Sequence, residues 1–359
     1  MPTNNRELAM FLPRVRAVII IAAMLLATSA IAQETAEVTE YRVVHTWPLE
    51  KAVQAFDISP AGDFALLSYK DEPPVETRLD IHRFNLVDGT SETIRLSPKR
   101  VEGQGSLMIR ATAEAKAIAI SENGETFLAN WPSYIVSVHA DSGVMQDVTG
   151  IRDAGSGHTM FNVLEFAPDS TAAFGVGSGV VRFDLTGTTG EGIPYSRDVQ
   201  APGGQSLAVI SATKIATGSS QALTVATTGA DAPDCVIEGM VKDLDTDPVG
   251  SRLAGAVYDQ EANATDMVIW SLPDCQETIR WPTGVSFVPD IAWLPGGERI
   301  ATAGGDGQLR FWDVETGTQV HSLAVESDAG FKMHFSDDAT HLVTFTLWGD
   351  RMLRFFESQ

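Results

Sequence analysis

The chain has 359 residues, of which 47 are acidic and 25 are basic, so its formal net charge at neutral pH is −22. A surface this acidic repels phosphate groups, which argues against nucleic acid and anionic lipid as partners because both bind through clustered lysine and arginine. The length is sufficient for one large domain with a sizeable core or for two smaller domains.

The first residues have the pattern of a secretory signal. Arg14 and Arg16 precede an apolar run over residues 17–32, which ends in Ala30-Ile31-Ala32. We expect cleavage after Ala32, an acidic tether over residues 33–40, and a periplasmic or secreted bacterial protein. The alternative is an uncleaved anchor, although the run is shorter than the roughly 18 apolar residues that a membrane span needs.

The remainder of the chain repeats one pattern, in which a short apolar strand, a corner rich in Ser, Pro, Asp and Gly, and a second apolar strand follow one another. This pattern is typical of a β-hairpin. Its copies lie at 56–69, 117–130, 164–176, 207–219, 243–257, 291–304 and 333–345. The sequence therefore predicts seven units of similar construction.

A third strand follows each hairpin, and a fourth follows in most units. In the sixth unit these are RFWDVETG (310–317) and TQVHSL (318–323). Four antiparallel strands in every unit of about 40 to 50 residues are the signature of a β-propeller blade. Residues 106–119 are rich in helix formers, and we expect a long connection there with at most one helical turn. The predicted fold is all-β, a seven-bladed β-propeller over residues 41–359 with four-stranded blades.

The two ends of the repeat region complement each other. The seventh unit stops after three strands at RFFESQ (354–359), while YRVVHTWPL (41–49) stands alone before the first unit. Residues 44–46 match residues 320–322 of a fourth strand. We therefore expect the strand at about 41–47 to complete the last blade and close the ring, which removes open sheet edges.

Two segments resemble the WD-repeat family. AGGDGQLRFWDVETG (303–317) carries the Trp-Asp pair and the turn aspartate of that family, and GHTMFNVLEFAPDS (157–170) carries its Gly-His dipeptide. The resemblance implies a propeller that binds protein partners.

In WD-repeat proteins, the Gly-His histidine, a Ser or Thr on the second strand, the turn aspartate and the tryptophan form a structural hydrogen-bond network. The resemblance therefore implies that Thr302, Asp306 and Trp312 belong to such a network in the sixth blade, and His158 in the third. No unit of this chain carries the complete set.

The two cysteines, Cys235 and Cys275, both follow Pro-Asp and lie at equivalent places in neighbouring repeats. In an exported protein the oxidising compartment favours a disulfide between them. The alternative is two independent buried thiols.

Few residues are candidates for catalysis or for metal binding. DLDTDP (243–248) places carboxylates at alternate positions, as a calcium loop begins, but Pro248 replaces the required glycine, so corner aspartates are the favoured interpretation. His334, on a predicted innermost strand, could face the central channel, but a core position is the favoured interpretation. No histidine has metal-ligand spacing, so we expect no metal and no cofactor, and we identify no catalytic residue.

Aromatic residues in the corners between second and third strands are the best candidates for binding. Trp131 and Tyr134 flank this corner in the second unit, and Trp348 lies in it in the seventh. Exposed Trp and Tyr are typical interface anchors, although each indole can instead pack on a neighbouring blade.

We therefore expect a monomeric binding or scaffold protein for protein partners in the cell envelope. The alternatives are a lactonase-like propeller hydrolase and a propeller that binds a small ligand or a cation.

Overall fold

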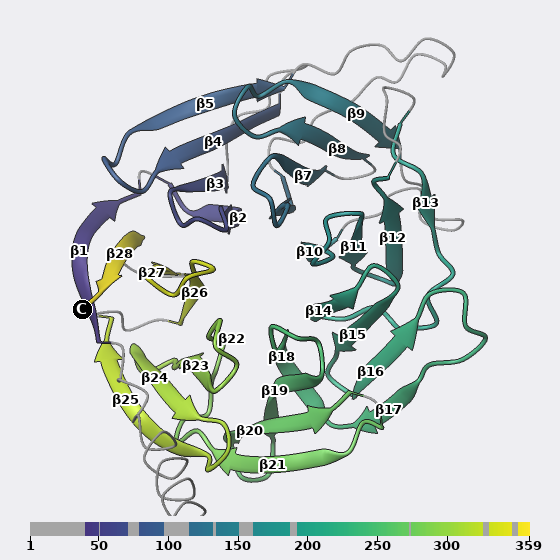
Figure 1. The fold of residues 1–359 in the computed structure, drawn as a ribbon, viewed down its shortest axis with the longest axis vertical. Coiled ribbons are helices and arrows are strands. Elements are labelled where there is room, and N and C mark those ends of the chain that lie inside the picture. The colour runs from purple at the N-terminus through teal and green to yellow at the C-terminus, as the bar shows by residue number, and fades with distance from the viewer. Residues whose placement is uncertain are drawn as a thin grey trace, which may run out of the picture. The chain divides into compact units, whose positions relative to one another are not determined.

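The computed structural model describes residues 40–49, 51–70, 79–96, 115–131, 134–150, 161–186, 192–272, 274–325, 330–346 and 351–359. Residues 41–359 form one compact unit, in which sheets radiate around a central axis (Figure 1). Within the described residues the strands form seven four-stranded antiparallel sheets, which confirms the predicted seven-bladed β-propeller.

The blades follow one another along the chain, and the strands of each blade run in sequence from the axis to the rim. Blade 1 has β2 (Val53–Ile58), β3 (Phe64–Tyr69), β4 (Leu79–Asn85) and β5 (Ser91–Leu96), and blade 2 has β6 (Ala117–Ile120), β7 (Thr126–Trp131), β8 (Tyr134–His139) and β9 (Met145–Gly150). Blade 3 has β10 (Val163–Phe166), β11 (Ala172–Val176), β12 (Val180–Asp184) and β13 (Tyr195–Ser196), and blade 4 has β14 (Ser206–Ser211), β15 (Lys214–Gly218), β16 (Ala222–Thr227) and β17 (Cys235–Glu238). Blade 5 has β18 (Met240–Thr246), β19 (Arg252–Asp259), β20 (Ala264–Ser271) and β21 (Glu277–Pro282), and blade 6 has β22 (Asp290–Trp293), β23 (Arg299–Ala303), β24 (Gln308–Asp313) and β25 (Thr318–Ala324). Blade 7 has β26 (Phe331–Phe335), β27 (His341–Thr346) and β28 (Met352–Ser358), and its outer strand is β1 (Tyr41–Pro48) from the start of the unit.

Two segments predicted near the start of the chain fall outside this description. The first is the apolar run 17–32. The second is residues 106–114, which make up most of the helix-forming stretch 106–119. The strand β6 begins at Ala117. No helix in the part of the chain that the structure describes is long and apolar enough to cross a membrane.

A corner with positive φ joins the first and second strands of six blades. Glycine occupies this position in four of them, for example Gly62 with φ 69° and Gly250 with φ 66°. Ser170 (φ 57°) and Ala339 (φ 56°) adopt the same conformation in blades 3 and 7. The corner requires a conformation that glycine adopts without strain, which explains why the sequence marks it so often with glycine.

The hydrophobic core lies between the blades. Buried apolar side chains of the described residues form seven clusters, and each cluster combines residues of two neighbouring blades. In the cluster between blades 2 and 3, for instance, Leu128 and Ile135 pack against Phe161 and Phe183. Each blade therefore depends on both neighbours for its burial, and a blade at an open end would expose one face.

The ring is closed by the first strand of the unit. β1 pairs antiparallel with β28, from Tyr41 opposite Ser358 to Pro48 opposite Met352. Figure 1 shows β1 at the outer edge of blade 7, with its end beside blade 1. The prediction that a strand at about 41–47 completes the last blade is confirmed.

Two aromatic side chains of β1 attach it to both neighbouring blades. Tyr41 is 5% exposed, stacks on Phe311 of blade 6 at 5.7 Å between ring centres, and donates a 2.7 Å hydrogen bond from its hydroxyl to the Ala339 carbonyl. Trp47 packs edge-on against Phe84 of blade 1, with the ring centres 5.3 Å apart. The closing strand thus contacts blades 6, 7 and 1 together.

We predict that Tyr41→Ala lowers the free energy of unfolding by about 3–5 kcal/mol, as other large-to-small core substitutions do. Tyr41→Phe should cost about 1 kcal/mol, because it removes only the hydrogen bond to the Ala339 carbonyl. Urea denaturation followed by tryptophan fluorescence measures both changes. Val43→Ala, at a 42% exposed position of the same strand, is the control and should change little. Equal effects of all three substitutions would contradict the anchoring role of Tyr41.

Candidate functional site

The innermost strands of the seven blades surround a central channel with a volume of about 1020 Å³. These strands are β2, β6, β10, β14, β18, β22 and β26 (Figure 1). Each is the inner edge of its sheet, so part of its backbone N–H groups has no partner within the blade. The side chains that line the channel decide how these groups are satisfied.

Charged residues enter the channel at two repeated positions. The reference point is the corner residue of a blade, which follows its innermost strand and donates its backbone N–H to the carbonyl five residues later, as Ser59 does to Phe64. Asp57, Glu165, Asp245 and His334 lie two residues before the corner residue of blades 1, 3, 5 and 7, and we call them the first layer. Asp243, Asp290 and Lys332 lie four residues before it in blades 5, 6 and 7 and form the second layer. Because alternate residues of a strand share a face, the two layers lie about 7 Å apart along the channel.

The carboxylates of both layers accept hydrogen bonds from the innermost strand of the next blade. Asp57 Oδ2 accepts the Ile120 N–H at 2.7 Å, Glu165 Oε1 the Val209 N–H at 3.0 Å, and Asp245 Oδ2 the Trp293 N–H at 2.7 Å. In the second layer, Asp243 Oδ2 accepts the Ile291 N–H at 2.9 Å and Asp290 Oδ2 the Met333 N–H at 2.6 Å. These contacts satisfy edge N–H groups that the sheets leave unpaired.

A lysine partly balances the second layer. Lys332 Nζ lies 2.7 Å from Asp290 Oδ1 and 3.8 Å from Asp243 Oδ1. Burial opposes its charge, but the two aspartates raise the pKa of Lys332 above its ordinary value. Burial also raises the pKa of Asp243 to about 7, although Lys332 acts in the opposite direction.

The four residues of the first layer include no lysine or arginine that could balance the carboxylates. Burial raises the pKa of Asp57 and of Asp245 to about 7, against the effect of the backbone hydrogen bonds that each accepts. Burial also raises the pKa of Glu165 well above its usual range, and the negative charges of Asp245, Glu122 and Asp57 add to this effect. Each of these carboxylates would therefore gain from a nearby positive charge.

His334 shares the first layer with these carboxylates. Burial lowers its pKa to about 4, so the imidazole is neutral at physiological pH. Its Nε2 atom is buried and has no hydrogen-bond partner among the described residues. The structure thus departs from the favoured interpretation of His334 as a core residue, because the side chain is among those that line the channel.

The two openings of the channel differ in charge. Glu122 and Asp337 lie at the corner end, where burial raises the pKa of both carboxyls, with a further contribution from Asp337 to Glu122 and from Asp338 to Asp337. Lys70 and Lys116 line the opposite end. The field along the channel thus runs from an acidic to a basic opening.

The three carboxylates of DLDTDP divide between two tasks. Asp243 and Asp245 belong to the two channel layers, whereas Asp247 sits in the corner and accepts hydrogen bonds from the backbone of Ser251 and Arg252 at 2.6 and 2.9 Å. Within the described residues, no group of three or more His, Cys, Asp or Glu is arranged to hold a metal ion. The interpretation as corner aspartates is therefore correct for Asp247 but wrong for Asp243 and Asp245, which lie on β18 and whose direction the alternation alone did not indicate.

The aromatic residues proposed as anchors have different surroundings. Trp131 is 1% exposed and packs in the cluster between blades 1 and 2, which corresponds to the alternative in which the indole packs against a neighbouring blade. Tyr134 is half-buried at the start of β8 and packs partly against the same cluster. Trp348 lies outside the described residues.

The residues implied by the family resemblance are partly connected. Trp312 Nε1 donates a buried 2.9 Å hydrogen bond to Thr302 Oγ1, which ties the second and third strands of blade 6 together. Asp306 instead pairs with Arg310, at 2.5 Å between Oδ2 and Nη2, in the corner of the same blade. His158 lies outside the described residues.

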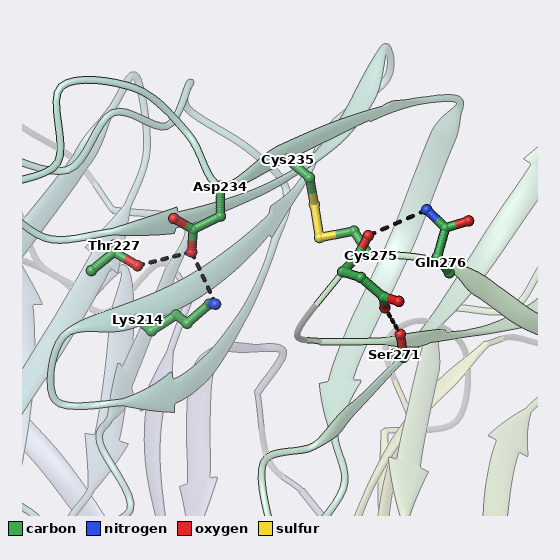
Figure 2. The surroundings of a disulfide bond; sticks show 8 residues. Lys214, Thr227, Asp234, Cys235, Ser271, Cys275 and Gln276 are labelled. Carbon is green, nitrogen blue, oxygen red and sulfur yellow. Dashed lines mark hydrogen bonds and ion pairs between the residues drawn. A yellow bond between two sulfur atoms is a disulfide. The ribbon is translucent and has the colours of Figure 1, made fainter.

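A disulfide joins Cys235 and Cys275, whose Cα atoms are 6.5 Å apart. Cys235 begins β17, the outer strand of blade 4, and Cys275 lies in the corner between β20 and β21 of blade 5. Figure 2 shows the bond between the two blades, beside Asp234, which pairs with Lys214 at 3.0 Å. The predicted disulfide is thus present and joins the outer parts of neighbouring blades.

We predict that the protein is more stable at pH 5 than at pH 8. A carboxyl whose pKa is higher in the folded state keeps its proton there after the unfolded chain has lost it, so stability falls as the pH rises from about 4 to about 7. The lowered pKa of His334 acts oppositely between about 6.5 and 4, but several carboxyls outweigh one imidazole.

Urea denaturation at a series of pH values measures this dependence. Asp57→Asn should flatten the curve, whereas Glu92→Gln, on the exposed outer strand β5, should leave it unchanged. A stability that rises from pH 5 to pH 8 would contradict the prediction.

We predict that Cys235→Ala/Cys275→Ala lowers the free energy of unfolding by about 4 kcal/mol, because the bond closes a 40-residue segment of the unfolded chain. A reductant should destabilise the wild type by a similar amount and leave the double variant unchanged. Thiol labelling of the unreduced, denatured protein is the second measurement, and two labelled thiols would contradict the bond.

Comparisons with known proteins agree with this architecture. The sequence pattern described as the anaphase-promoting complex subunit 4 WD40 domain matches residues 268–338, which include all four strands of blade 6. No curated protein sequence matches significantly.

Among solved structures, the chain is similar to the β-propeller domain of Cps50 (Swd1) from Myceliophteria thermophila. The TM-score is 0.65 at 11% identity, and the alignment covers 89% of this chain and all of that domain. At this identity the likeness concerns the fold alone. The chain is thus a seven-bladed β-propeller, in which the segment 268–338 is similar to a WD40 domain.

Proposed function

We propose that the protein is a scaffold that binds a protein partner in the cell envelope, after export through the signal at residues 1–32. The WD40 match and the propeller fold support a role in protein interaction, since such rings commonly present binding loops. The disulfide supports export, because disulfides persist in oxidising compartments.

The observation that carries the proposal is the closed ring itself. Apolar clusters at every junction between blades, and the pairing of β1 with β28, hold the seven sheets as one rigid platform. Corners and connections at the ends of the blades do not contribute to this pairing, so their residues are available for recognition. The net charge of −22 favours a partner with a basic surface.

The face at the corners between second and third strands is the proposed contact surface. Tyr134 lies at this corner in blade 2, and Trp348 belongs to the same corner in blade 7 by its position in the sequence. Trp131 supports this corner from the core, so its replacement by alanine would leave a cavity and cost about 3–5 kcal/mol. A test of binding therefore keeps Trp131.

We predict that a photo-crosslinking residue in place of Tyr134 captures one recurrent partner in the native envelope, identified by mass spectrometry. The additional change Trp348→Ala should reduce this capture by about tenfold, since an aromatic anchor commonly contributes that much to binding.

The control places the same crosslinker at Tyr195, a 40% exposed residue on the outer strand of blade 3. Equal capture from both positions, or capture that Trp348→Ala does not change, would contradict the proposed face.

A lactonase-like hydrolase is the second candidate. It is favoured by the convergence of His334, Glu165 and several aspartates on one channel. Hydrolysis would need one of these groups to act as a general base. Burial raises the pKa of Asp57 and Asp245 to about 7, so these carboxylates suit that task at neutral pH better than His334, whose pKa burial lowers to about 4. The scaffold ranks first because the family match supports it directly.

A further inference from the structure

The charges of the channel are unevenly matched. Lys332 pairs with Asp290 and Asp243 of the second layer. No ion pair within the described residues involves Asp57, Glu165 or Asp245 of the first layer. These three carboxylates come from blades 1, 3 and 5, so they approach the channel from separate directions.

The three carboxylates differ in the hydrogen bonds that they already accept, because both oxygens of Asp57 and of Asp245 accept backbone N–H groups. Glu165 accepts the Val209 N–H through Oε1, and no contact within the described residues engages its Oε2. Burial disfavours the ionisation of Glu165, and the negative charges of Asp245, Glu122 and Asp57 add to this effect. Glu165 can therefore accept a further donor, and a cation among these groups would relieve their mutual repulsion.

A second observation, independent of the acidic groups, indicates the kind of donor. The Nε2 atom of His334 is buried in the same layer without a hydrogen-bond partner among the described residues. A buried polar atom without a partner is uncommon and costly. A neutral imidazole nitrogen can accept a hydrogen bond from an ammonium group, as the carboxylates can.

The arrangement fits an organic amine better than a metal ion. Metal sites need ligand atoms at about 2–2.6 Å from one point, and no such group of residues exists in the described part of the chain. An alkylammonium instead offers several N–H donors, and a chain with two or three of them can contact carboxylates that lie apart. The volume of about 1020 Å³ is sufficient for such a molecule.

We propose that the central channel binds a small organic polyamine through Asp57, Glu165 and Asp245, with His334 Nε2 as a further acceptor. The amine enters at the corner end, where Glu122 and Asp337 attract cations, and Lys70 and Lys116 at the other end limit its depth. This proposal is independent of the protein partner, because the carboxylates that bind the amine lie on the innermost strands and not at the corners between second and third strands.

The probe is spermidine, and its binding to the purified full chain is measured by isothermal titration calorimetry at pH 7. Glu165→Gln should weaken binding by about tenfold or more, because it removes a charge-assisted hydrogen bond. The glutamine oxygen can still accept the Val209 N–H, so this variant keeps the contact between blades 3 and 4. Repeating the titration in buffers of different ionisation enthalpy should reveal proton release, since the cation favours ionised carboxylates.

Glu92→Gln is the matched control, because it removes the same charge from the exposed outer strand β5. It should not change the affinity for spermidine. If Glu165→Gln fails to fold, as thermal unfolding would show, Asp57→Asn replaces it in the same titration.

Three outcomes would overturn the proposal. They are no measurable spermidine binding, an equal loss in Glu92→Gln and Glu165→Gln, and displacement of spermidine by millimolar Ca²⁺ or Mg²⁺ at constant ionic strength. The second outcome would indicate non-specific attraction to the acidic surface, and the third a metal site.

Discussion

The pairing of β1 with β28 is the constraint on which the structure depends. Each blade buries apolar side chains against both neighbours, so every sheet has two partners only when the ring is closed. The closing strand joins the beginning of the unit to its end, so residues far apart in the sequence pair in it, as Tyr41 does with Ser358. Tyr41 reinforces this junction because it packs against blade 6 as well as its own blade.

Closure also creates the channel and determines its chemistry. The innermost strand of each blade is a sheet edge, and seven such edges meet around the axis without room for another strand. Side chains must therefore satisfy the N–H groups of these edges, and carboxylates do so at five contacts between neighbouring blades. The same groups give the channel its negative charge, so a structural requirement and a capacity for binding cations have one origin.

Polar bonds between blades extend beyond the channel. Asn130, fully buried in blade 2, accepts the Phe161 N–H of blade 3 at 3.1 Å, and the disulfide joins blades 4 and 5 at their outer edge. Polar or covalent links thus join different pairs of blades at different radii: carboxylates at the axis, Asn130 between blades 2 and 3, and the disulfide at the rim between blades 4 and 5.

The sequence by itself determined the seven units and the closing strand, whereas the choice between a disulfide and two free thiols needed the 6.5 Å between the Cα atoms of Cys235 and Cys275. The units and the closing strand follow from local signals, since a hairpin corner needs Gly62 or an equivalent residue with positive φ, and the incomplete last unit needs a fourth strand. Only the tertiary structure decided where Trp131 and Asp245 point. Trp131 belongs to a corner by sequence but enters the cluster between two blades, and Asp245 belongs to a strand that is covered on both faces. Alternation along such a strand does not distinguish the channel from the neighbouring blade, because that distinction arises only when the sheets are arranged around a common axis.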